Sequence, residues 1–177
     1  MRTPVCLFAA LFFGLAGCGK PSAPPAAPSI EAPREFKFDI LDFGVYETLG
    51  DTVIKAAPST AAGRVSEHDG LNLLGATDRL RAQRGVVFGY RYRIVGQLQG
   101  EVDDFEMHVI HPSMRGVDGK FHTNQTAPIK LFFENGAVED HIVYTLREAF
   151  EVLPGTWTLQ IRFKGTPVIT KSFTLTP

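Results

Sequence analysis

Cysteine is nearly absent from this chain, which has only Cys6 and Cys18 among its 177 residues. A scaffold held together by disulfides is therefore excluded, because Cys6 lies in an apolar leader segment and Cys18 has no other possible partner. Clusters of positive charge are also absent, since 18 basic and 19 acidic residues are spread along the chain. Binding to a phosphate backbone needs a concentrated basic face, so we expect no nucleic-acid partner.

Catalytic sequence motifs are missing as well. The chain contains no GxSxG elbow, no HExxH pair, no P-loop and no glycine-rich dinucleotide fingerprint. Acidic neighbours such as Asp103 and Asp104 face opposite sides of a strand, so such a pair alone does not form an acid–base dyad. We therefore predict that the protein is not an enzyme and uses no cofactor.

The first residues have the pattern of a secretion signal. A short basic start is followed by the apolar run Val5 to Leu15, which is too short to remain in a bilayer as a span. The next letters, LAGC, resemble the lipobox of bacterial lipoproteins. That resemblance implies that residues 1–17 are cleaved and that Cys18 becomes the lipid-carrying first residue, acylated by fatty acids such as palmitate. The alternative is an ordinary small-residue cleavage site that happens to end in cysteine.

The lipid on Cys18 would decide where the protein resides. Two or more acyl chains give durable membrane attachment, whereas one chain gives only marginal binding. In enteric-type bacteria an aspartate after the cysteine retains lipoproteins at the inner membrane, so Gly19 favours the outer membrane, with the domain facing the periplasm. Residues 18–35 form a proline- and alanine-rich tether. In an extended form of about 3.1 Å per residue, this tether would hold the domain roughly 40 Å from the lipid.

From Phe36 onward the hydrophobic pattern has a period of two, which is typical of half-buried strands. Alternating stretches occur near 88–94, 129–133, 142–146 and 156–163. The letters KGTP after Phe163 predict a turn, so the strands 156–163 and 168–175 should form a hairpin. We predict an all-β domain over residues 36–177, an antiparallel β-sandwich of immunoglobulin-like type, with at most one short helix near 71–83.

Four stretches of the chain also carry a family resemblance. They are DFGVYE at 42–47, TDRLRAQRGVVFGYRY at 77–92, VIHPSM at 109–114 and EVLPGTWTLQI at 151–161. Together they resemble an uncharacterised bacterial family, domain of unknown function 3859, over most of residues 36–177. The resemblance implies a small extracytoplasmic β-domain, and it supplies no activity and no site residues.

The run FEMHVIHPSM at 105–114 gathers two histidines and two methionines and raises the question of a metal site. In a strand, Phe105, Met107, Val109 and His111 share one face while His108 lies on the other, so the run is split. We interpret it as a core strand. A second hypothesis remains, in which the side chains of His111, Met114 and His122 meet at one end of the sandwich and bind copper.

The function predicted from the sequence is a lipid-anchored binding or assembly-accessory module of the cell envelope, with an envelope protein as partner. Phe132 and Val143 are the candidate contact residues, because they are apolar at positions where their strands face solvent. The alternative function is that of a periplasmic copper-binding protein. We expect His68 and His141 to be solvated, the first in a loop and the second at the start of a strand.

Overall fold

The structure is a computed structural model that describes residues 36–96 and 98–177, so the signal segment, Cys18 and the tether lie outside the described residues. The strands in this part of the chain are β1 (Lys37–Ala56), β2 (Arg64–Gly75), β3 (Arg79–Arg81), β4 (Val87–Val95), β5 (Gly100–Arg115), β6 (Phe121–Phe133), β7 (Ala137–Thr145), β8 (Gly155–Phe163) and β9 (Thr166–Thr176). One turn of 3-10 helix, η1 (Ala149–Glu151), precedes β8.

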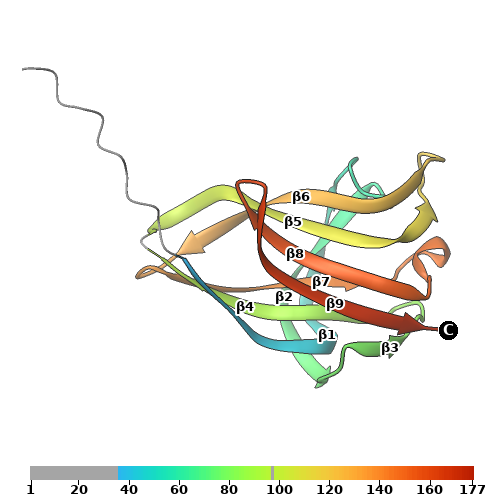
Figure 1. Ribbon diagram of the computed structural model, residues 1–177, viewed down its shortest axis with the longest axis horizontal. Helices are drawn as coiled ribbons and strands as arrows, with labels where there is room; N and C mark the ends of the chain where they lie inside the picture. Colours follow the sequence, from blue (N-terminus) through green and yellow to red (C-terminus); the bar gives the residue numbers. More distant parts are fainter. Residues whose placement is uncertain (1–35, 97) are drawn as a thin grey trace, which may run out of the picture. The chain divides into compact units, whose positions relative to one another are not determined.

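The strands form two sheets that face each other (Figure 1). The first sheet has the order β2-β1-β4-β7 and the second has the order β3-β9-β8-β5-β6. All neighbouring strands run antiparallel except β3, which pairs with β9 in parallel. The predicted antiparallel β-sandwich is therefore confirmed.

Alternation along the strands builds the core between the two sheets. Trp157, Leu159 and Ile161 of β8 are fully buried, as the period-two pattern predicts. The indole of Trp157 meets the ring of Phe88 from β4 edge to face, with the ring centroids 5.8 Å apart. Aromatic side chains from both sheets thus hold the layers together.

The predicted hairpin at the carboxyl end is present. β8 and β9 pair in antiparallel fashion from Gly155 to Phe163. The turn residues Lys164 and Gly165 both have positive φ values, 49° and 78°. Two such residues match the type I′ turn, whose twist suits a two-residue hairpin connection.

A glycine pair shapes the outer face of the first sheet. Gly44 of β1 lies opposite Gly89 of β4. Tyr46 donates a hydrogen bond of 2.6 Å from its hydroxyl to Asp42 Oδ1, two residues beyond Gly44 on the same face, so its ring must cross Gly44. Burial and the hydrogen bond to Asp42 raise the pKa of Tyr46 above its usual range. A Cβ atom on either glycine would collide with the backbone of a neighbouring strand, at Gly75 for Gly44 and at Ile142 for Gly89.

Beyond Tyr46, β1 leaves β4 and continues with β2 as a two-stranded extension, residues 47–72, which we call the arm. The pairing of β1 with β2 shifts register between Leu49 and Thr52. The tip of the arm reaches the second sheet, where the Val117 amide donates to the Ala61 carbonyl at 2.9 Å and the Ser59 hydroxyl donates to the Thr126 carbonyl at 3.0 Å. Figure 1 shows the arm running across the direction of the sandwich strands.

The sequence predicted at most one short helix, near 71–83, and the structure forms none there. Residues up to Gly75 belong to β2, and Arg79–Arg81 form β3, which pairs with the end of β9. The leucines in this stretch serve strand pairing and not a helical face, because Leu73 pairs with Tyr46 and Leu80 pairs with Leu175. Tertiary pairing overrides a weak local preference here.

The chain enters and leaves the sandwich at opposite ends (Figure 1). Phe36, the first described residue, packs against Phe163 beside the β8–β9 turn, with ring centroids 4.9 Å apart. The arm leaves β4 near the other end, after the nine or so residues over which β1 follows β4. At about 3.3 Å per strand residue, roughly 30 Å separates the two ends.

Candidate functional site

Two hollows lie under the arm, at the end of the sandwich far from Phe36. The smaller is a cavity of about 80 Å³ between the arm, β7 and β5. The larger, about 490 Å³ and open to solvent, lies between the arm and the ends of β4 and β7, and we call it the arm cleft. Arg64, Thr145 and Arg147 line both hollows. This end of the domain therefore offers a concave, positively charged surface.

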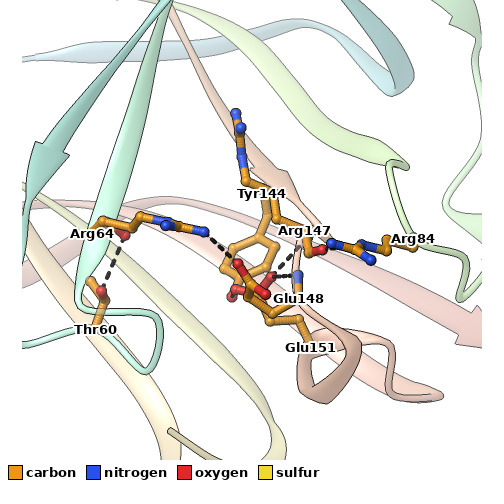
Figure 2. A network of polar contacts seen from close by, with 7 residues as sticks. All are labelled: Thr60, Arg64, Arg84, Tyr144, Arg147, Glu148 and Glu151. Carbon is orange, nitrogen blue, oxygen red and sulfur yellow. Dashed lines mark hydrogen bonds and ion pairs between the residues drawn. The ribbon is translucent and has the colours of Figure 1, made fainter. Parts of the chain in front are cut away.

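A buried carboxylate organises the floor of this region (Figure 2). Glu151 is only 3% exposed and accepts three hydrogen bonds. Its donors are the Tyr144 hydroxyl at 2.9 Å and the backbone amides of Arg147 and Glu148 at 2.8 and 2.7 Å. Burial and the Glu151 charge raise the pKa of Tyr144 far above its ordinary value, so the phenol stays a neutral donor. The network fixes the course of the chain between β7 and β8.

Three arginines surround this floor, and they differ in their partners. Arg64 on the arm pairs with the Glu148 carboxylate. Arg84, which is exposed, donates from Nε to the Arg147 carbonyl at 2.6 Å. The Arg147 guanidinium is half-buried and has no hydrogen bond or ion pair with any side chain that the structure describes, which leaves out residues 67 and 97. Figure 2 shows it pointing away from Glu148 and Glu151.

His68 on the arm lies next to this free guanidinium. The prediction that it sits in a loop is wrong, because it belongs to β2 and pairs with Thr52 of β1. Its Nδ1 is 3.1 Å from the Thr52 hydroxyl, whereas its Nε2 is buried and has no partner in the part of the chain that the structure describes. Burial lowers the pKa of His68, and the charge of Arg147 lowers it further, so the imidazole is neutral near pH 7.

The three residues of the copper hypothesis lie at the same end of the second sheet. Met114 of β5 is directly opposite His122 of β6, and both Met114 and His111 are buried. His122 is close enough to His111 to affect its pKa, which burial holds below the usual range. Among the described residues, no group of three or more His, Cys, Asp or Glu side chains is placed to hold a metal ion.

The two imidazoles are oriented by hydrogen bonds on one nitrogen each. His111 donates from Nδ1 to the Pro112 carbonyl at 2.9 Å, which leaves Nε2 as a buried lone pair without a partner. His122 is 2.9 Å from Asp118 Oδ1 through its Nε2, which leaves Nδ1 as its second nitrogen. The ring of His111 also packs on Trp157, with centroids 5.3 Å apart.

The two predicted protein-contact residues lie on different sheets. Phe132 is near the end of β6, on the second sheet, and is 65% exposed. Val143 lies opposite Gly89 on the first sheet, is half-buried and lines the small cavity under the arm. Both side chains are on the outward register that the alternation predicted, but they do not belong to one continuous patch.

Sequence reasoning did not identify Arg147, His68 or Glu151. The arm brings His68 beside Arg147 although the two are far apart in the chain, so no local spacing marks them. One local signal was present, since Glu148 and Glu151 form a capping box around the η1 turn. That signal locates the turn but not the cleft.

The fold defines the class of this protein as an immunoglobulin-like β-sandwich. A crystal structure of an immunoglobulin-like protein from Pseudomonas aeruginosa is similar, with a TM-score of 0.58 and 25% sequence identity. The match covers 82% of this chain and 100% of that one.

The chain belongs to the family described as domain of unknown function DUF3859, whose profile matches residues 34–175. No curated protein sequence matches the chain. A DNA-bound alkylpurine DNA glycosylase from Pseudomonas fluorescens shares 8% identity over 55% of this chain and 27% of its own, with a TM-score of only 0.35. Within the residues that the structure describes, no helix is long and apolar enough to cross a membrane.

Proposed function

We propose that the protein is a non-enzymatic binding module of the bacterial cell envelope, anchored through lipid on Cys18, with its ligand surface at the arm. The observation that carries this proposal is the position of the arm cleft, at the end of the domain opposite Phe36. Phe36 is the residue through which the tether joins the domain. The cleft lies at the end of the domain away from Phe36, which favours binding of a ligand in the periplasmic space, with the outer membrane as the preferred membrane.

The anchor is tested by replacing Cys18 with serine in the full-length chain. We expect the Cys18→Ser variant to lose incorporation of labelled palmitate and to move from the membrane fraction to the soluble fraction. Cys6→Ser is the matched control, because Cys6 lies in the segment that the proposal removes. A Cys18→Ser protein that keeps its lipid label would contradict the proposal.

A protein partner is tested with a photo-cross-linking residue placed at position 132 or 143. Phe132 is 65% exposed, so a cross-linker there should form an adduct with an envelope protein. Val143 lines the small cavity under the arm, so an adduct there would place the partner at the arm, whereas an adduct at Phe132 would place it at the end of β6. If position 132 gives no adduct in intact cells, Phe132 is not a contact residue.

A second candidate function is copper binding by His111, Met114 and His122. It is favoured by one observation, the buried Nε2 lone pair of His111 that no group in the described part of the chain satisfies. Neutral imidazole and thioether are ligands suited to copper(I). The hydrogen bonds on the other nitrogens of His111 and His122 are of the kind that orients metal-binding imidazoles.

Copper binding is tested by titrating the full-length chain with copper(I) against a competing chelator. We expect one ion per chain, and we expect His111→Gln and Met114→Leu to weaken binding. Met114→Leu replaces the sulfur while keeping a similar volume, so a loss of binding in this variant does not reflect unfolding. His141→Gln serves as a control outside the three residues. Equal affinity in the parent and the His111→Gln protein would end this candidate.

A further inference from the structure

We propose that Arg147 and His68 form a binding site for an oxyanion, a carboxylate or a phosphate, beneath the arm. The inference deepens the proposed binding role by naming the chemistry of the ligand. Its starting point is an electrostatic imbalance, because the half-buried Arg147 guanidinium has no acceptor among the described residues. A charge removed partly from water is unfavourable unless a partner compensates it.

The neighbouring His68 supplies a further donor in one of its neutral tautomers. His68 carries a buried Nε2 without a partner, and its Nδ1 lies 3.1 Å from the Thr52 hydroxyl. With the Nδ1 accepting the hydroxyl proton, the neutral ring has its N–H at Nε2, and that donor has no acceptor. Arg147 and His68 thus present unsatisfied hydrogen-bond donors on the same side of the arm. One oxyanion would accept hydrogen bonds from both.

Nearby arginines raise the positive electrostatic potential around Arg147 and His68 without occupying the proposed anion site. Arg84 uses Nε on the Arg147 carbonyl and keeps its terminal nitrogens free of described partners. Arg64 is paired with Glu148, and the Glu151 carboxylate is occupied by its three donors. Glu148 and Glu151 are therefore committed elsewhere, while the planar guanidinium of Arg147 fits the two oxygens of a carboxylate or a phosphate.

The arm joins the two halves of this site. His68 and Thr52 come from the arm, whereas Arg147 follows β7 in the sandwich. An anion held between them bridges the arm to the body of the domain. Ligand binding should therefore stabilise the folded state and, in particular, reduce opening of the arm.

The test is a titration of the purified full-length chain with inorganic phosphate and with citrate at constant ionic strength, followed by calorimetry and by the thermal unfolding midpoint. We expect millimolar binding that raises the midpoint. Arg147→Gln should weaken binding by roughly tenfold or more, which corresponds to the loss of one charge-assisted hydrogen bond. In anion-free buffer the same variant should unfold at an equal or higher midpoint, because it lacks the uncompensated charge.

Arg79→Gln is the matched control, since Arg79 is an exposed arginine on β3, outside both hollows. Co-sedimentation with phosphatidylglycerol vesicles, compared with phosphatidylcholine vesicles, separates a lipid headgroup from a free anion. Binding that depends on Arg147, either to the free anions or to the vesicles, supports the site and shows whether the ligand is a free anion or a lipid headgroup. The site is disproved if neither phosphate, nor citrate, nor the vesicles bind. It is also disproved if Arg147→Gln and Arg79→Gln lose binding affinity equally. Neither negative result affects the test of Cys18, so failure of this site and failure of the anchor are distinguishable.

Discussion

At the scale of single residues, Glu151 is a buried carboxylate that three hydrogen bonds hold in place. A carboxylate at 3% exposure is stable there only because three donors surround it. Tyr144, the Arg147 amide and the Glu148 amide would each lose their acceptor if the carboxylate were removed. Its role is to hold the β7–β8 connection on which the floor of the arm cleft depends.

Replacing Glu151 with leucine should therefore destabilise the domain by about 3 kcal/mol or more, since each buried donor left without an acceptor costs about 1–3 kcal/mol. Tyr144→Phe is the matched variant, because it removes one of the three bonds, and it should cost about 1–2 kcal/mol. Urea unfolding of both proteins measures the difference. Equal losses would show that the backbone amides do not depend on Glu151.

His111 gives the domain a pH-dependent stability. Burial lowers its pKa in the folded state, against a smaller upward influence of the Pro112 hydrogen bond; His122 lowers it further and Glu151 raises it. The unfolded chain, with a histidine pKa of about 6.5, then binds a proton more readily than the folded one. Stability is complete above that value and falls as the pH decreases through it towards the folded pKa.

We expect the free energy of unfolding to decrease between pH 8 and pH 5, with a smaller decrease in His111→Gln than in the parent. His68 and His108, whose pKa values are also lowered mainly by burial, should account for part of the remaining slope. Chemical denaturation at a series of pH values measures the slopes. Identical slopes for the parent and His111→Gln would mean that His111 is not titrating across this range.

At the scale of elements, the tight contact between β4 and β7 depends on a glycine. A Cβ atom on Gly89 would lie 2.0 Å from the Ile142 carbonyl oxygen, and a backbone atom cannot move away as a flexible side chain can. Gly89→Ala should therefore destabilise the domain by at least about 2 kcal/mol, as overpacking does in other cores. Gly75→Ala is the control, since no atom lies within 4 Å of its Cβ position. Thermal unfolding compares the two, and equal midpoints would disprove the steric argument.

The strand pattern was predictable from sequence because side-chain alternation is a local property. Thr156–Phe163 and the β8–β9 turn appear as expected, and so does the division of residues 105–111 between two faces. The strands near 71–83 were not predicted, because their leucines pair with Tyr46 and Leu175, which are distant in sequence. Pairing between residues that are distant in the sequence leaves no periodicity in the local hydrophobic pattern.

At the scale of the whole molecule, the arm and the sandwich should differ in local stability. Several apolar side chains of the arm are exposed, among them Leu49, Val53 and Ile54, whereas Phe88 and Trp157 are fully buried in the sandwich. Backbone regions with few buried contacts open without global unfolding. The arm is therefore expected to exchange its amide hydrogens as a separate, less stable unit.

Native-state hydrogen exchange with mass spectrometry tests this expectation. Peptides from residues 47–72 should exchange faster than peptides from β4 and β8, and Ser59→Ala should accelerate the arm further by removing the bond to the Thr126 carbonyl. Ser172→Ala is a control that removes a serine hydroxyl from the sandwich. Uniform protection across the arm and β8 would show that the domain opens only as one unit.

The sequence by itself determined the strands and the layered architecture, because each depends on neighbouring residues or on composition. It also supports the anchor prediction at Cys18, which depends on the letters LAGC. Only the tertiary structure decided which side chains meet at the arm. His68 and Arg147 are brought together by a strand that leaves its sheet, and their missing partners become visible only when burial is known. Alternation is encoded within a few residues, whereas burial and electrostatic pairing between distant strands are properties of the folded chain.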